Sequence, residues 1–199
     1  MVLANIVDSH CHLDLEAFSD QFEAVLARAE EAGVTCWQTI CTRLDGFEAI
    51  YELATRHPRL FCSVGVHPHE AGEEPLVTTE TLVAYASRPR VIGIGETGLD
   101  YYYEHAERSA QQESFRRHIQ AARATDLPDI VHSRDAEDDT IAILQEERTR
   151  GPFRLLIHCF TAGPALAEAV VALGGSHTVS VIITYPNAPP LRATIEQVP

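Results

Sequence analysis

The sequence predicts an α/β fold, specifically a TIM-type (β/α) barrel that ends before its eighth strand. Short apolar or β-branched runs alternate with longer amphipathic stretches, in units of roughly 30 residues. This alternation is typical of right-handed crossovers in a parallel sheet. Seven such units fit into 199 residues, whereas a complete barrel has eight in about 250.

Each element follows from its own pattern. Strands are expected over seven runs: Ile6–Cys11, Cys36–Cys41, Phe61–Val66, Val91–Ile94, Ile130–Val131, Leu155–Ile157 and Val179–Thr184. Helices are expected between them: Ser19–Ala32, Leu44–His57, Thr79–Ala86, Glu107–Thr125, Ala136–Thr149, Pro164–Leu173 and one opening near Pro189. Gly33 is expected to end the first helix, and Pro128 to separate the fourth helix from the strand that follows it. No linker divides the chain, so we expect residues 1–199 to form a single, C-terminally incomplete domain.

The bulk composition favours a globular protein of the cytoplasm. Hydrophobic residues make up 45% of the chain, but no apolar run approaches the roughly 20 residues of a membrane span. The N-terminus has no basic segment followed by a cleavable apolar one. The five cysteines are an odd number without a C-x-x-C pair, which predicts reduced, packed thiols.

The charge balance limits the class of partner. Fifteen basic residues face 29 acidic ones, giving a net charge of -14, and the densest basic stretch is the short one from Arg148 to Arg154. This argues against a protein that coats duplex DNA tightly by neutralising phosphates. A phosphodiester substrate stays possible, because metal ions held by acidic residues can supply the local positive charge.

Metal-ligating residues follow the predicted strands. The first strand reads IVDSHCHLD, whose alternation puts His10 and His12 on one face. Later strands are followed by GVHPH, GIGETGLDYY, IVHSRDA and LIHCFTAG. In a parallel barrel these positions share one rim, so we expect His10, His12, Glu96, His132 and His158 to form a two-metal hydrolytic site. Any one of them alone is as well explained by packing or capping.

The succession DSHCHLD, SVGVHPHEA, GIGETGLDYYYEH, LPDIVHSRDA and HCFTAG resembles the TatD family of metal-dependent deoxyribonucleases in the amidohydrolase superfamily. The resemblance covers nearly the whole chain. It implies a TIM-type barrel, two divalent ions (Mg, Mn or Zn) and 3′-5′ exonuclease or phosphodiesterase activity on DNA, at single-stranded or 3′ ends. It also implies that His10 and His12 bind one ion, His132 and His158 bind the other, and Glu96 bridges them.

Several positions depart from the family pattern, mostly near the C-terminus. The family's E-T-D-x-P motif, with its catalytic Asp, is not found in these residues, and GGSHTVSVIIT replaces another conserved strand. Asp129 occupies an apolar strand position, and His118 stands where Gln is usual. These changes bear on the activity of the chain.

Three further groups are candidates for binding substrate. His67 and His69 of GVHPH could contact the scissile phosphate or orient the metal ligands, and a role in substrate binding and catalysis is favoured for His67. Arg134 is expected to bind a phosphate oxygen. For Arg134 the alternative is a surface salt bridge with Asp135, Glu137 or Asp138. The tyrosines at 101–103 are suited to stack on bases or simply to pack in a loop.

Two other functions compete with DNA hydrolysis. The same rim could hydrolyse a lactone, an amide or an aminoacyl ester, although many such relatives bridge their metals with a strand lysine and no predicted strand here contains one. Alternatively, the shortened chain is a non-catalytic remnant. A barrel without its closing strand leaves unpaired edges on the first and seventh strands.

Overall fold

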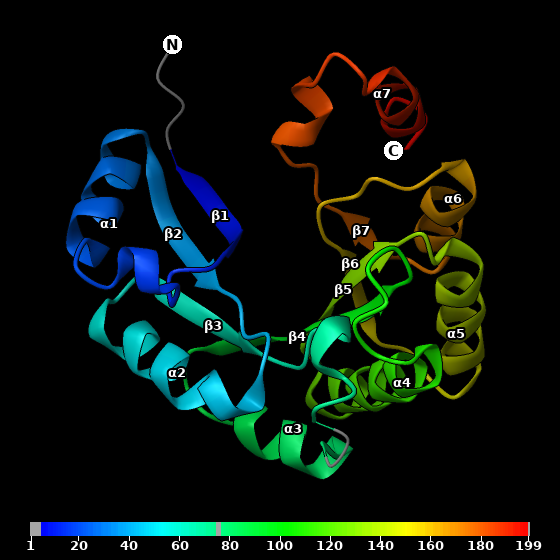
Figure 1. The fold of residues 1–199 in the computed structure, drawn as a ribbon, viewed down its shortest axis with the longest axis horizontal. Helices are drawn as coiled ribbons and strands as arrows, with labels where there is room; N and C mark the ends of the chain where they lie inside the picture. The colour runs from blue at the N-terminus through cyan, green and yellow to red at the C-terminus, as the bar shows by residue number, and fades with distance from the viewer. Residues whose placement is uncertain (1–4, 75–76, 199) are drawn as a thin grey trace.

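The computed structural model describes residues 5–74 and 77–198, which form one curled parallel sheet with helices on its outer side (Figure 1). The strands lie in sequence order: β1 (Ile6–Cys11), β2 (Val34–Thr39), β3 (Leu60–Val64), β4 (Val91–Asp100), β5 (Pro128–Arg134), β6 (Arg154–Ile157) and β7 (Ser176–His177). The α-helices are α1 (Phe22–Glu31), α2 (Phe47–Arg56), α3 (Thr79–Ala86), α4 (Arg108–Thr125), α5 (Glu137–Thr149), α6 (Pro164–Ala172) and α7 (Pro189–Ile195). The barrel-type fold predicted from the sequence is confirmed.

The helices bury their apolar faces against the outside of the sheet in two clusters. The first packs α1, α2 and α3 on β1 to β4, with Trp37 and Phe47 among its largest members. The second packs α4, α5 and α6 on β4 to β6, around Phe115, Ile119 and Leu144. Burial of this apolar surface is the main force that holds each helix on its strands, and it leaves the strand ends free to carry polar side chains.

The end of the sheet differs from the sequence prediction. A strand over Val179–Thr184 is wrong, because β7 is only Ser176–His177 and Val181–Thr184 forms a 3-10 helix. Pairing with the β6 side ends at Thr178, whose N–H donates to the Ile157 carbonyl. Ser180 then caps the 3-10 helix by accepting the Ile182 N–H. Val181 stays 66% exposed, so its β-branched side chain has no sheet to pack against.

Strand β4 extends well beyond the predicted Val91–Ile94 and reaches Asp100. Glycines allow its neighbours to come close: a Cβ on Gly65 would lie 2.4 Å from the Gly95 Cα, and a Cβ on Gly98 would lie 2.1 Å from the His132 carbonyl oxygen. The peptide bond between Gly95 and Glu96 is cis. The longer strand places Glu96 and Asp100 on one face, four residues apart.

The sequence predicts reduced, packed thiols. All five cysteines are free, and Cys41 and Cys62 are buried. In the part of the chain that is described, no helix has the length and apolarity needed to cross a bilayer.

Asp129 on β5 is an ionisable residue in the apolar layer. Its side chain is fully buried, and neither carboxylate oxygen has a hydrogen-bond partner. Burial raises its pKa well above the ordinary range for aspartate, since a buried charge without a partner is costly. The folded protein therefore holds a proton on Asp129 at pH values where the unfolded chain has lost it.

We expect Asp129→Asn to stabilise the protein, increasingly so as the pH rises from 4 to 8. The pKa of Asp129 is higher in the folded than in the unfolded protein. Between these two pKa values, the free energy of unfolding of the wild type therefore falls by about 1.4 kcal/mol for each unit of pH. Chemical denaturation across this range measures the difference. The exposed Asp20→Asn is the matched control for loss of one surface charge, and equal pH profiles for wild type and Asp129→Asn would contradict the account.

Candidate metal centre

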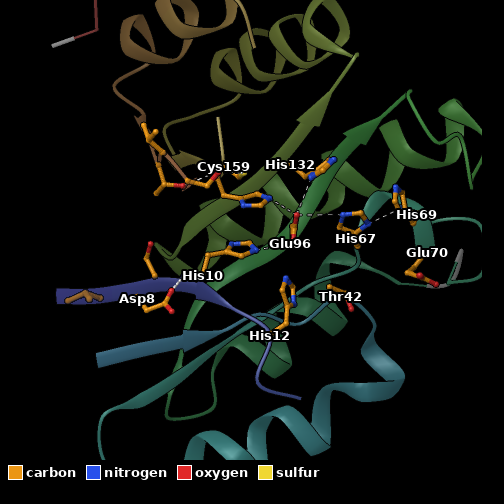
Figure 2. A pocket seen from close by; sticks show the side chains of 16 residues that line it. Asp8, His10, His12, Thr42, His67, His69, Glu70, Glu96, His132 and Cys159 are labelled. Carbon is orange, nitrogen blue, oxygen red and sulfur yellow. Dashed lines mark hydrogen bonds and ion pairs between the residues drawn. The ribbon is translucent and has the colours of Figure 1, made fainter. Parts of the chain in front are cut away.

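A single buried carboxylate, that of Glu96, lies at the centre of the site (Figure 2). Its Oε2 is 3.2 Å from His10 Nε2, and its Oε1 is 3.2 Å from His132 Nδ1 and 2.6 Å from His158 Nε2. The ring of His12 lies edge-on to that of His10, with centroids 5.3 Å apart. The four histidines expected from the sequence therefore meet around the carboxylate of the fifth residue, Glu96.

Parallel strands explain this convergence. His10 lies on β1, Glu96 on β4 and His132 on β5, while His12 and His158 come directly after β1 and β6. The carboxyl ends of all these strands open on the same rim of the curled sheet. The backbone N–H of Glu96 donates to the Cys41 carbonyl beyond the end of β2, at 3.0 Å. This hydrogen bond holds the backbone of Glu96 against the segment that follows β2.

The residues around Glu96 fit divalent metal ions. The Nδ1 of His10 is buried without a hydrogen bond, and the Nε2 atoms of His10 and His158 are buried with only the Glu96 carboxylate beside them, an arrangement that coordination of a metal ion would satisfy. Ligand atoms lie within 4.8 Å of one another in two groups that share Glu96, one with His10 and His12 and the other with His67 and His132. Imidazole nitrogen with carboxylate oxygen is a donor set that suits Zn and related ions.

The site is strongly polarised by its own charges. Burial alone would raise the pKa of Glu96, but the nearby nitrogens of His10, His132 and His158 outweigh it and hold the pKa well below the ordinary range. Burial would lower the pKa of His132, but Glu96 and Asp100 outweigh it and raise that pKa. An ionised carboxylate therefore stands ready to attract cations into the centre.

His67 faces the same carboxylate but is suited to a different task. Its Nδ1 accepts the backbone N–H of His69 at 3.2 Å, and its Nε2 lies 3.6 Å from Glu96 Oε1. Burial lowers its pKa to about 3, so the ring is neutral at pH 7. With Nδ1 used as an acceptor, the proton must be on Nε2. Although His67 is close enough to Glu96 and His132 to share a metal ion with them, in this tautomer it presents an N–H donor to the site and no lone pair.

His118 supports the segment that carries His67. Its Nε2 accepts the Val66 N–H at 3.0 Å, and its Nδ1 lies 2.7 Å from the Ser114 carbonyl oxygen on α4. The ring is fully buried, and burial lowers its pKa to about 4, in keeping with a neutral imidazole that donates through Nδ1. His118, which stands where the family pattern has Gln, thus links α4 to the GVHPH segment through hydrogen bonds.

A cavity of about 760 Å³ opens in front of Glu96. The metal-site histidines line it together with Thr42, Glu70 and the β7 end.

Arg134 lies outside this cavity and lines a smaller one beside His132 and His158. Its guanidinium stacks on Tyr102 at 4.0 Å and Tyr103 at 4.8 Å. In the described part of the chain, no carboxylate lies within ion-pair distance of Arg134, unlike the salt bridges considered from the sequence.

Sequence reasoning missed Asp100 as a member of the site. It is buried, and its Oδ2 lies 3.0 Å from both His69 Nε2 and His132 Nε2. The signal was present in GETGLD, because residues four apart on a strand share a face. It would have required β4 to be predicted at its full length.

Comparisons with known proteins agree with this geometry. The model of the family described as TatD related DNase matches residues 7–199. An uncharacterized metal-dependent hydrolase, YcfH of Escherichia coli K12, is 39% identical over 98% of this chain and 73% of its own length. A Mycobacterium tuberculosis protein named as an uncharacterized metal-dependent hydrolase, TatD, is 30% identical over 98% of this chain and 75% of its own. The crystal structure of the TatD homologue YjjV of E. coli superposes with a TM-score of 0.83 at 29% identity, over 98% of this chain and 75% of that one.

The fold, the site and these relatives define a metal-dependent hydrolase. The chain belongs to the TatD family.

We expect Glu96→Gln to abolish tight binding of divalent ions, because it removes the only carboxylate shared by both groups of ligands. Isothermal titration with Mn²⁺ or Zn²⁺ measures the loss, which should exceed 100-fold in affinity at the shared site. The control is Glu70→Gln, since Glu70 lines the same cavity but pairs with Arg43. Unchanged binding by Glu96→Gln would show that the ions lie elsewhere.

Proposed function

We propose that the protein is a phosphodiesterase that acts on DNA, most specifically a 3′-5′ exodeoxyribonuclease for single strands or 3′ ends, with two divalent ions (Mg, Mn or Zn). The observation that carries this proposal is the buried Glu96 carboxylate with histidines close to both of its oxygens. His10 and His12 would hold one ion, His132 and His158 the other, and Glu96 would bridge them. When bound, such a pair clamps a phosphate and lowers the pKa of water towards neutrality.

The chain's own groups would complete the chemistry. The Nε2–H of His67 points into the centre and can donate a hydrogen bond to a phosphate oxygen as negative charge develops there. Because the low pKa of His67 keeps the ring neutral, this donor is present throughout the neutral range. The aspartate of the family's final strand is not among these residues, so we assign no general base.

Arg134 and the tyrosines beside it support a nucleic-acid substrate. A guanidinium with no carboxylate partner can bind a phosphate oxygen, and two of its N–H groups can do so together. Tyr102 and Tyr103 are 57% and 51% exposed, which leaves their rings accessible to bases. This arrangement would hold a short single-stranded end without a basic groove, in agreement with a net charge of -14.

Hydrolysis of a lactone, an amide or an aminoacyl ester is the competing enzymatic function. In many such relatives a modified lysine bridges the metals. The 199-residue sequence contains no lysine, and a glutamate occupies the centre of the site. This favours the phosphodiesterase.

The direct test is degradation of a 5′-labelled single-stranded oligonucleotide in Mn²⁺ or Mg²⁺. We expect stepwise shortening from the 3′ end, reduced about 10²- to 10³-fold in kcat by His67→Ala because a donor to the developing charge is lost. His67→Gln, which can restore an N–H donor, is the matched variant and should recover part of the rate. Hydrolysis of lactones or aminoacyl esters with no cleavage of DNA would overturn the proposed substrate. Inactivity on every ester, with the metals bound, would favour the non-catalytic remnant.

Arg134 should act in binding more than in chemistry. We expect Arg134→Ala to raise the KM for an oligonucleotide about tenfold, equivalent to about 1.4 kcal/mol, with little change in kcat. Steady-state kinetics separates the two parameters. Arg154→Ala is the control, since Arg154 is exposed at the far end of β6. A fall in kcat at constant KM would contradict a binding role.

A further inference from the structure

Asp100 connects the candidate metal centre to the segments around it through both of its carboxylate oxygens. Its Oδ2 lies 3.0 Å from the Nε2 of His132 and 3.0 Å from the Nε2 of His69. Its Oδ1 accepts the backbone N–H groups of Tyr102 and Tyr103, each at 3.0 Å. The side chain is 1% exposed, so all of these contacts are shielded from water.

We propose that Asp100 is a positioning residue that fixes the tautomer of His132, so that the His132 Nδ1 lone pair faces Glu96 and is free for a metal ion. This inference rests on the metal centre of the proposed function. It assigns Asp100 a role in preparing that centre, without contact to the ion itself.

The tautomer follows from what each group can donate. An ionised carboxylate only accepts hydrogen bonds, and a neutral imidazole carries one N–H. The short contact with Asp100 therefore requires the proton on His132 Nε2. In this neutral form Nδ1 is an acceptor that lies 3.2 Å from a second acceptor, Glu96 Oε1. A cation between the two atoms, either a proton or a metal ion, removes their repulsion, and a metal ion takes the place of the proton when it binds.

The backbone of Asp100 is held as firmly as its side chain. The Asp100 N–H donates to Gln111 Oε1 at 2.8 Å, and Gln111 Nε2 donates to the Asp100 carbonyl at 3.2 Å. Gln111 lies on α4 and is fully buried. Helix α4 thus holds Asp100 in place through Gln111, and Asp100 in turn orients His132. The bond to His69 extends the same network to the GVHPH segment, which also carries His67.

The test uses Asp100→Asn in the full chain. Asparagine keeps an oxygen for the Tyr102 and Tyr103 N–H groups, but its NH₂ would face the two histidines. His132 Nε2 must then become an acceptor, which moves its proton to Nδ1, where it opposes metal binding. The matched control is Asp139→Asn, because Asp139 Oδ2 likewise accepts two hydrogen bonds, from Tyr101 and Gln112, and lies on α5.

Two measurements are made on each variant. Long-range ¹H–¹⁵N spectra of histidine-labelled, metal-free protein at pH 9.5 report the tautomer of His132, assigned with a His132→Gln variant. Calorimetric titration with Zn²⁺ reports affinity. We expect the Nε2–H tautomer in wild type and Asp139→Asn, the Nδ1–H tautomer in Asp100→Asn, and a 10- to 100-fold weaker Kd for Zn²⁺ in Asp100→Asn alone.

Each outcome decides the matter. An Nδ1–H tautomer in wild type, or a wild-type Kd in Asp100→Asn, overturns the role of Asp100. If wild type shows the Nε2–H tautomer and Asp100→Asn reverses it, but neither binds Zn²⁺, the proposed metal function fails while the control of the tautomer stands. Should Asp100→Asn fail to fold, the wild-type tautomer decides alone.

Discussion

The whole arrangement depends on one buried carboxylate surrounded by histidine nitrogens. Glu96 is 3% exposed and ionised, and the Nε2 atoms of His10 and His158 lie 3.2 Å and 2.6 Å from its oxygens. A buried anion is costly without a compensating positive charge, and imidazole nitrogens and carboxylate oxygens together can ligate a metal cation. The energetic demand for metal ions is therefore a property of the folded chain, and it gives the family's metal dependence a physical basis.

The fold separates stability from function. The helices bury apolar surface on the outer side of the sheet, in two clusters that between them reach from β1 to β6. This packing holds each strand so that its carboxyl end carries one or two polar side chains to the rim. Buried side chains of α4 then hold the segments that carry these groups. His118 accepts the Val66 N–H next to His67, and Gln111 accepts the Asp100 N–H.

The sequence was sufficient for the fold class and for the convergence of the five histidine and glutamate positions, because strand periodicity and parallel topology determine both. It was insufficient where structure depends on contacts between distant segments. The run Val179–Thr184 has β propensity, but Ser180 caps a 3-10 turn there instead. The tautomer of His67 depends on a backbone N–H two residues away, and the tyrosine partners of Arg134 come from the turn that follows β4. Neither can be read from spacing alone.

Anomalous diffraction from crystals soaked in Mn²⁺ or Zn²⁺ tests the central claim most directly. The account predicts two peaks on either side of the Glu96 carboxylate, one beside His10 and His12 and the other beside His132 Nδ1 and His158. Peaks only on the exposed acidic surface, with none next to Glu96, would contradict it.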